Sequence, residues 1–214
     1  MKITKIDLGH EIFANCYLLV DEKTGESAIV DPAYFNDEIA DIFDEAGMGE
    51  LKYILLTHGH FDHIFGVHGL KEATGAQVVI HKGDADFLLD PKKSLAESNF
   101  PEQQLPVEAD IILNDGDELF LGEEKITVVS TPGHTMGSVC YIVEGDRVLI
   151  SGDTLFCMTA GRTDLYGGNE EMMIESLKKL IALEGDYRVL PGHNRETSLE
   201  RERTRNWYIR RMVK

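Results

Sequence analysis

The first half of the chain carries short apolar runs separated by polar turns, followed by a stretch with helical spacing. Residues 1–31 are predicted to be strands, because the apolar runs IFANCYLLV and SAIVDP flank the turn DEKTG. Apolar residues recur at helical spacing over 36–47, where Gly47 can end a helix. The other elements predicted in this half are a buried strand LKYILL (51–56), a helix at about 66–74, a strand AQVVI (76–80) and a short helix at 82–89.

The second half begins again with short apolar runs and ends with helices. Glycine-containing turns separate five predicted strands: IIL (111–113), DELFL (117–121), KITVVST (125–131), SVCYIV (138–143) and RVLISG (147–152). A helix over 169–183 and a strand YRVL (187–190) follow. The last helix, at about 198–211, is predicted to open with the capping box Thr197-x-x-Glu200. Residues 91–108 are expected to form an irregular flap between the halves.

Both halves therefore run from strands to a helix and a further strand, which predicts an α/β fold. A four-layer αβ/βα sandwich, with two mixed β-sheets inside and helices outside, is one arrangement that buries all these apolar faces. The 214 residues contain no linker or low-complexity segment. We expect one domain over residues 1–214.

Composition and charge narrow the choice of partners and compartment. With 43% apolar residues the chain can bury a large core, and its formal net charge of −17 disfavours binding to nucleic acid. The three cysteines form no CxxC pair, which is typical of a reducing compartment. The N-terminal sequence has no apolar signal region, and no apolar run reaches about 18 residues. We expect a cytoplasmic protein with a small-molecule substrate and no membrane partner.

Histidines and aspartates gather directly after the predicted strands. The segments are THGHFDH (57–63), PGH (132–134), SGD (151–153) and PGH (191–193). Loops beyond strand ends can bring several side chains into one cavity. A single buried histidine is most often a core residue, but four such segments together point to a metal site.

The spacing of these residues predicts two neighbouring metal ions. His58 and His60 stand two apart in extended backbone and can face one ion, with His134 as the third ligand. Asp62, His63 and His193 form a second set, because Asp62 and His63 can turn toward a second ion. Asp153 is the candidate bridge, since one carboxylate can bind both ions.

These segments also resemble those of a known family. THGHFDH resembles the THxHxDH signature of the metallo-β-lactamase superfamily, and PGHT, SGDT and PGH resemble its later motifs in the same order. With an aspartate at position 153, the set is most similar to the glyoxalase II branch, the hydroxyacylglutathione hydrolases. That resemblance implies the four-layer fold, hydrolysis of S-acyl-glutathione thioesters, and a dinuclear centre of Zn, Fe or Mn. It implies the same ligand sets as above, and we expect two divalent ions, most often Zn.

The chain departs from glyoxalase II around the substrate. It ends about 20 residues after His193, without the C-terminal helical extension of the full-length enzymes. Arg195 stands in place of a thiol-binding tyrosine, and Arg162-Thr163-Asp164 in place of a lysine and a tyrosine. Arg162 and Arg195 are therefore candidate substrate-binding residues. A structural ion pair with Asp164 is an equally good interpretation of Arg162. The GRTD segment also resembles the persulfide dioxygenases, which use one iron in the same fold.

The expected chemistry is hydrolysis by activated water. Two cations lower the pKa of water from about 16 toward about 7, and the hydroxide then attacks a thioester carbonyl. Asp62 is expected to be a ligand that also orients the hydroxide. An iron-dependent persulfide dioxygenase is the alternative. A nuclease is disfavoured by the negative charge, and a non-catalytic metal-stabilised binding module would leave the ligands without a purpose.

Overall fold

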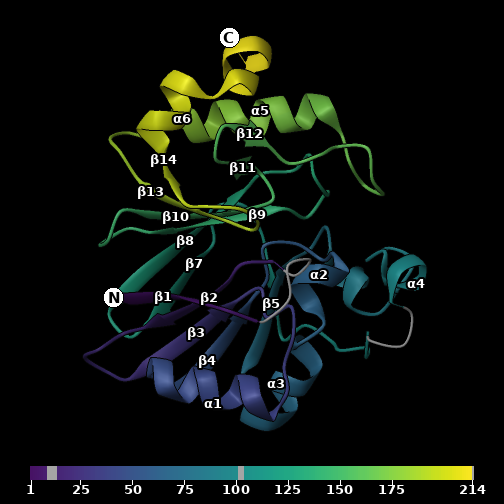
Figure 1. The fold of residues 1–214 in the computed structure, drawn as a ribbon, viewed down its shortest axis with the longest axis vertical. Helices are drawn as coiled ribbons and strands as arrows, with labels where there is room; N and C mark the ends of the chain where they lie inside the picture. Colours follow the sequence, from purple (N-terminus) through teal and green to yellow (C-terminus); the bar gives the residue numbers. More distant parts are fainter. Residues whose placement is uncertain (9–13, 101–103, 214) are drawn as a thin grey trace.

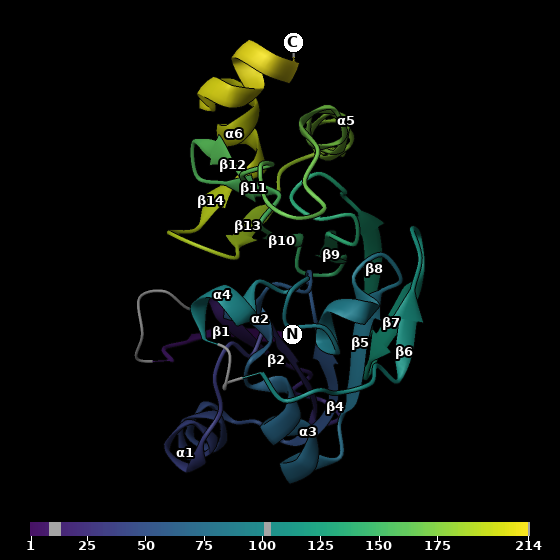
Figure 2. The same ribbon diagram turned by 90° about the vertical axis from the view of Figure 1, so that its right-hand side faces the viewer.

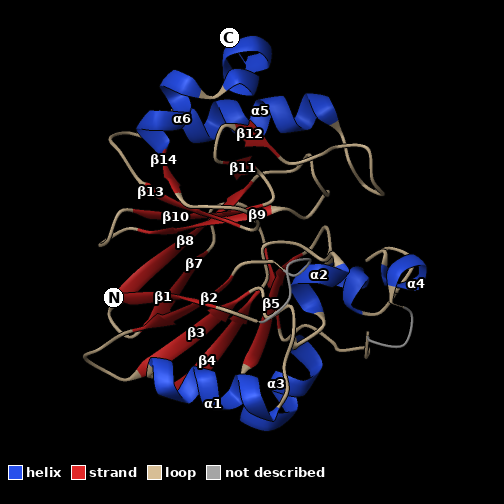
Figure 3. Ribbon diagram, in the orientation of Figure 1, coloured by secondary structure: helices blue, strands red, loops and turns tan. Residues whose placement is uncertain are grey.

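The computed structural model describes residues 1–8, 14–100 and 104–213, and it arranges them in four layers. Two six-stranded sheets face each other, with α1 (Asp37–Ala46) and α3 (Val67–Thr74) outside the first and α5 (Glu170–Ile181) and α6 (Leu199–Arg205) outside the second (Figures 1 and 3). The predicted αβ/βα sandwich of two mixed sheets is confirmed.

The first sheet has the order β1-β2-β3-β4-β5-β6, antiparallel up to β3 and parallel from there on. Its strands are β1 (Lys2–Ile6), β2 (Cys16–Val20), β3 (Glu26–Val30), β4 (Glu50–Leu55), β5 (Gln77–His81) and β6 (Ile111–Leu113). The short helices in this half are α2 (Phe61–Ile64), the 3₁₀ turn η1 (Ala85–Leu88) and α4 (Ala96–Asn99). Asn36 caps α1 by accepting from the Ile39 N–H, and Gly47 ends it in the left-handed conformation as predicted.

The second sheet has the order β14-β13-β10-β9-β8-β7, in which only β10 and β13 are parallel. Its strands are β7 (Glu118–Leu121), β8 (Glu124–Ser130), β9 (Val139–Val143), β10 (Val148–Gly152), β13 (Arg188–Pro191) and β14 (Thr197–Ser198). A two-stranded hairpin, β11 (Leu155–Phe156) and β12 (Thr159–Ala160), follows β10, and the π-helical turn η2 (Ile209–Val213) follows α6.

Successive side chains of each strand face two different apolar layers. One layer lies between the sheet and its outer helices, and the other lies between the two sheets and holds them together. On β2, Leu18 packs toward the outer helices, whereas Leu19 joins the apolar layer between the sheets. On β9, Tyr141 faces the layer between the sheets and Ile142 packs toward α5. The described residues include no helix with the length and apolar character needed to cross a membrane.

Two buried tyrosines join the sheets, and each binds a backbone carbonyl at the end of a strand of the other sheet. Tyr17 of β2 donates its hydroxyl to the carbonyl of Pro191 at the end of β13, at 2.8 Å. Tyr141 of β9 donates to the carbonyl of Leu56, just beyond β4, also at 2.8 Å. The hydroxyl of Tyr17 therefore binds the first residue of the predicted metal-binding segment 191–193, and that of Tyr141 binds the residue just before the segment 57–63.

Several sequence predictions were wrong in detail. The IIL segment was assigned to the second half, but as β6 it pairs with β5 in the first sheet. The last helix is interrupted between Arg205 and Ile209, and its N-cap is Ser198, one residue after the predicted Thr197. The hairpin β11–β12 and the strand β14 were not predicted. Residues 12–13 of the first apolar run and residues 101–103 of the predicted flap lie outside the described residues, and the flap contains α4.

The tyrosine ties predict a measurable loss of stability in Tyr141→Phe. Removing the hydroxyl leaves the Leu56 carbonyl without this donor in a buried layer, so unfolding free energy should fall by about 1–2 kcal/mol. The measurement is urea unfolding followed by circular dichroism, with the exposed Tyr166→Phe as control, expected within about 0.5 kcal/mol of the original protein. An unchanged unfolding midpoint in Tyr141→Phe would show that the hydrogen bond to the Leu56 carbonyl does not stabilise the fold.

Candidate metal centre

The predicted ligand residues all follow strands, and the fold brings those strand ends to one place between the sheets. His58 and His60 lie in the loop after β4, and α2 then supplies Asp62 and His63. From the second sheet come His134 after β8, Asp153 after β10 and His193 after β13. Among the described residues, the ligand atoms fall into three overlapping groups, and within each group they lie within 4.8 Å of one another.

Three imidazole nitrogens form the first group. His60 Nδ1 lies 3.1 Å from His58 Nε2 and 2.8 Å from His134 Nε2. All three residues are buried, and burial together with the neighbouring imidazoles lowers the pKa of His58 well below its usual value. Burial is also the main reason why the pKa of His60 falls to about 3. The His58 and His60 rings are therefore neutral, which is the form that binds metal.

Hydrogen bonds on the far side of two rings fix which nitrogen faces the group. His134 Nδ1 lies 2.7 Å from the carbonyl oxygen of Arg162, which can only accept, so Nδ1 carries the proton. Thr57 donates its hydroxyl to Asp31 and can accept from His58 Nδ1 at 3.2 Å. The Nε2 atoms of both histidines are then bare lone pairs directed at one point.

A second group contains Asp62, His63 and His193, and a third, made of His58, His63 and Asp153, overlaps both. His193 Nε2 is 3.2 Å from Asp62 Oδ2. Asp153 Oδ2 is 3.5 Å from His134 Nε2 and 3.7 Å from His193 Nε2, while its Oδ1 is 3.6 Å from His63 Nε2. Asp153 is thus within reach of both sets, as a bridging carboxylate would be.

The glycines of the two PGH segments permit this approach. A Cβ at Gly192 would lie 2.2 Å from Asp153 Oδ1, so a side chain there would displace the carboxylate. Gly133 has φ of 146° and lies against the backbone of Met173, a conformation and a space that favour glycine.

The residues fit a pair of divalent cations. Three buried atoms of the predicted ligand residues, His60 Nε2, His63 Nε2 and Asp153 Oδ1, have no hydrogen-bond partner among the described residues. Burial lowers the pKa of His63, but the carboxylates of Asp31 and Asp153 outweigh it and raise the pKa to about 9. The site therefore attracts positive charge, and a divalent cation would supply it in place of the imidazole proton.

Two further aspartates support the ligands, and neither was singled out from the sequence. Asp31 Oδ2 accepts from His63 Nδ1 at 2.9 Å and from the Thr57 hydroxyl at 2.7 Å. Asp84 accepts from the N–H groups of Gly59 and Gly137 and from the Thr135 hydroxyl, so it joins the loops that carry His60 and His134. Asp31 follows a strand directly, as Asp153 does, and that position was the available signal.

The metal groups open into a cavity of about 660 Å³. Its walls combine apolar side chains with a few polar ones. Apart from the metal-binding residues, the lining includes Phe61, Leu95, Asn99, Phe156, Thr159, Ala160, Arg162, Leu165 and Asn194. A cavity of this size, with polar groups at one end, suits a small organic substrate.

The two candidate substrate-binding arginines differ in position. Arg162 lines the cavity, and its Nε and Nη2 atoms each bind the carboxylate of Asp164 at 2.7 Å. Arg195 is not among the described lining residues, and its Nε donates to the Cys157 thiol at 3.3 Å. Arg162 is therefore the better placed of the two to meet a substrate.

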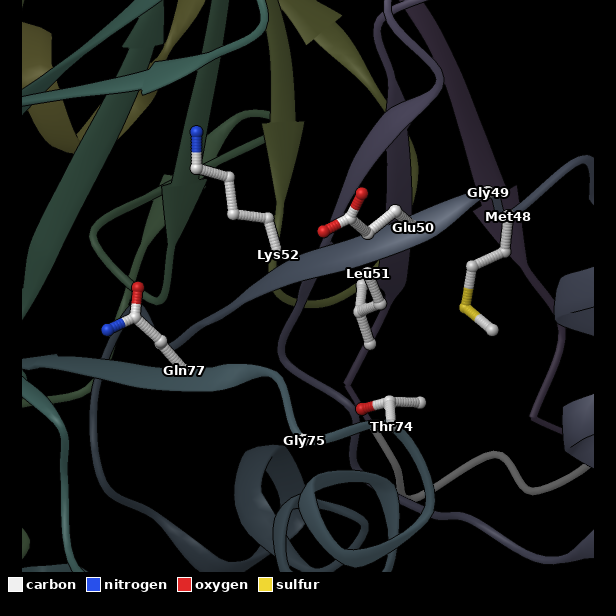
Figure 4. A pocket seen from close by; sticks show the side chains of 8 residues that line it. All are labelled: Met48, Gly49, Glu50, Leu51, Lys52, Thr74, Gly75 and Gln77. Carbon is white, nitrogen blue, oxygen red and sulfur yellow. The ribbon is translucent and has the colours of Figure 1, made fainter.

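A second cavity, of about 490 Å³, lies at the opposite end of β4 (Figure 4). Its lining consists of Met48, Gly49, Glu50, Leu51, Lys52, Thr74, Gly75 and Gln77. Lys52 is paired with Glu26 at 2.8 Å, and the labelled side chains include no histidine or cysteine. This cavity offers no comparable donor set.

Comparison with known proteins places this centre in a family. Residues 11–193 match the family model described as the Metallo-beta-lactamase superfamily. A probable metallo-hydrolase from Bacillus subtilis is 34% identical over 210 residues, which cover 98% of each chain. A hydroxyacylglutathione hydrolase from Cereibacter sphaeroides is 35% identical over 177 residues, which cover 83% of this chain and 61% of that enzyme.

Three solved structures share the fold over nearly the whole chain. The BLEG-1 B3 metallo-beta-lactamase has a TM-score of 0.89 at 31% identity, with 97% of this chain and 99% of that chain covered. TTHA1623, solved in a di-iron-bound form, has a TM-score of 0.83 at 29% identity and coverage of 96% and 99%. ETHE1 from Myxococcus xanthus has a TM-score of 0.78 at 28% identity and coverage of 98% and 84%.

The geometry predicts the behaviour of Asp153→Ala. The original protein, purified without chelators, should bind about two divalent ions per chain, and the variant should bind fewer because it lacks the carboxylate between the two groups. Elemental analysis of both proteins measures this, and circular dichroism should show that the fold is kept. The exposed Asp41→Ala is the control. Full metal content in Asp153→Ala would show that Asp153 does not bridge.

Proposed function

The chain belongs to the metallo-beta-lactamase superfamily, and from that premise we propose that it is a dinuclear metal-dependent hydrolase acting on thioesters of small acyl groups. The observation that carries this proposal is a pair of ligand groups at a substrate-sized cavity, with Asp153 Oδ2 3.5 Å from His134 Nε2 of one group and 3.7 Å from His193 Nε2 of the other. His58, His60 and His134 would hold one ion, and Asp62, His63 and His193 the other. The similarity to a hydroxyacylglutathione hydrolase supports the choice of thioester.

The chemistry is divided between the ions and the chain. When bound, two divalent cations, with zinc as our first choice, would lower the pKa of a water molecule and polarise an acyl carbonyl. Burial raises the pKa of Asp62, but its hydrogen bond to His193 and the nearby imidazoles outweigh this and lower the pKa to about 2. Asp62 also lines the cavity, so its carboxylate can accept a hydrogen bond from the attacking water.

The chain needs no strong proton donor for the leaving group. A thiol has a pKa of about 8.5, so a thiolate departs without prior protonation. The apolar part of the lining, with Phe61, Leu95, Phe156 and Leu165, can enclose an acyl chain. A thioester would therefore require no proton donor from the chain, unlike an ester or amide, whose leaving groups need a proton.

The test pairs metal analysis with three activity assays on the same sample. We expect about two metals per chain and hydrolysis of S-acyl thiols, followed by release of free thiol. One iron per chain with oxygen consumption on a persulfide would instead establish a dioxygenase, the second candidate, which the resemblance of the GRTD segment to persulfide dioxygenases supports. A β-lactam is the third substrate, because the BLEG-1 structure is a metallo-beta-lactamase. Absence of thioester turnover would remove the primary proposal.

Arg162 provides a test of substrate charge. Its Nη1 atom takes no part in the two bonds to Asp164, so the guanidinium can still donate to a substrate carboxylate at the cavity. We therefore predict that a negatively charged thioester is preferred, and that Arg162→Ala lowers kcat/KM for it by about tenfold with metal content unchanged.

The control for Arg162→Ala is Arg188→Ala. Arg188 makes the same kind of two-bond pair, with Glu196, but does not line the cavity. Kinetics on one anionic and one neutral thioester decide the point. An equal loss on both substrates would mean that Arg162 is structural and that the preference for negative charge should be abandoned.

A further inference from the structure

The hairpin β11–β12 forms one wall of the cavity and begins two residues after Asp153. Phe156, Thr159 and Ala160 of the hairpin line the cavity, and the Phe156 ring stands edge-on to His193 with ring centroids 6.2 Å apart. The turn between the strands consists of Cys157 and Met158. Met158 has φ of 70°, a left-handed conformation that a side-chain-bearing residue rarely adopts without support.

The support comes from α6, which lies beside the hairpin in Figure 2. Glu202 of α6 is fully buried, and its Oε2 accepts from the Met158 N–H at 2.8 Å. The same oxygen accepts from the Asn206 amide at 2.8 Å, and that amide also donates to the Thr159 carbonyl at 3.0 Å. Glu202 Oε1 accepts from the Thr197 hydroxyl at 2.7 Å. One buried carboxylate thus joins the turn, the helix end and β14.

The base of the hairpin is held by a separate set of bonds. Ser151 donates its hydroxyl to the Leu155 carbonyl at 2.7 Å, and the Gly161 N–H donates to the Thr154 carbonyl at 3.3 Å. The Thr154 hydroxyl lies 2.8 Å from that of Thr131. Loss of the Glu202 contacts should therefore loosen the tip of the hairpin while Asp153, next to its base, stays in place.

We propose that Glu202 is a positioning residue which, through the Met158 N–H and the Asn206 amide, fixes the tip of the β11–β12 hairpin and so sets the cavity wall formed by Phe156 and Thr159. Glu202 touches neither the ligand groups nor the cavity; it acts through the hairpin. The consequence for substrate selection rests on the proposed hydrolase function, whereas the effect on the hairpin does not.

Three variants separate this role from a general contribution to folding. Glu202→Ala removes the carboxylate contacts with Met158, Asn206 and Thr197. Glu202→Gln keeps them, because its amide oxygen can accept from Met158 and Asn206 while its NH₂ donates to the Thr197 oxygen. Glu200→Ala, an exposed glutamate of the same helix, is the control. Should Glu202→Ala fail to fold, Thr197→Val removes one donor to the carboxylate at equal volume, and a smaller change in the same direction is expected.

Hydrogen exchange over residues 154–161, measured by mass spectrometry at equal metal content, tests the hairpin directly. We expect exchange to rise by about tenfold in Glu202→Ala and to stay near the original rate in Glu202→Gln and Glu200→Ala. Unchanged exchange in Glu202→Ala, or in Thr197→Val if that variant stands in for it, would overturn the proposal. This readout holds whether or not the protein hydrolyses thioesters.

Kinetics on a large and a small acyl thioester test the consequence. In Glu202→Ala, KM for the large acyl group should rise by about tenfold while kcat, metal content and the constants for an acetyl thioester stay near their original values. Glu202→Gln should restore KM. Equal losses on both substrates, or loss of metal, would show that Glu202 does not act through the cavity wall. If the unmodified protein cleaves no thioester, the proposed function fails and hydrogen exchange alone decides the role of Glu202.

Discussion

The centre of this molecule depends on the attraction between positive charge and a cluster of imidazole and carboxylate lone pairs that hydrogen bonds within the cluster satisfy only in part. His58 and His134 direct unprotonated nitrogens at one point, because their other nitrogens are held by Thr57 and the Arg162 carbonyl. Asp153 brings negative charge between the two groups. Positive charge between them stabilises these unprotonated nitrogens and carboxylate oxygens, which otherwise repel one another. The surrounding structure holds the atoms in place against that repulsion. Strand ends, buried aspartates and the glycines of the PGH segments all serve that purpose.

Much of this could be predicted from the sequence, because the ligand segments are local and follow strands directly. The two mixed sheets, the outer helices and the family were predicted correctly, and the seven ligand residues do lie together. Where prediction failed, contacts between distant residues decided. The three-residue strand β6 joins the first sheet through β5, which no local pattern reveals. Thr197 was taken for a helix cap, but its hydroxyl binds Glu202, and Ser198 caps α6 instead. Asp84 supports loops far away in sequence, so its role becomes visible only in three dimensions, whereas Asp31 shares with Asp153 the position directly after a strand.

The cavity has two kinds of wall. On the metal side the residues are fixed by strand ends and by bonds to buried aspartates, a rigidity that suits chemistry requiring accurate placement. On the other side, the β11–β12 hairpin and the segment around α4 supply the apolar lining, and short irregular segments of this kind vary without disturbing the sheets. Substitutions in the hairpin and around α4 can therefore change which acyl group fits, while the metal centre stays the same. The proposed thioester specificity is then a property of about ten side chains around a common core.

The two buried tyrosines have a consequence for the whole fold. Tyr17 and Tyr141 each bind the backbone at or just before the start of a ligand segment of the opposite sheet, and the ligands of both groups come from both sheets. Sliding one sheet over the other would therefore break the tyrosine bonds and pull the ligand groups apart in one step. Separation of the sheets and dispersal of the two ligand groups become a single cooperative event. By mass action, any divalent ion that binds these groups would shift the folding equilibrium toward the closed sandwich, so a supply of metal would raise the stability of the protein.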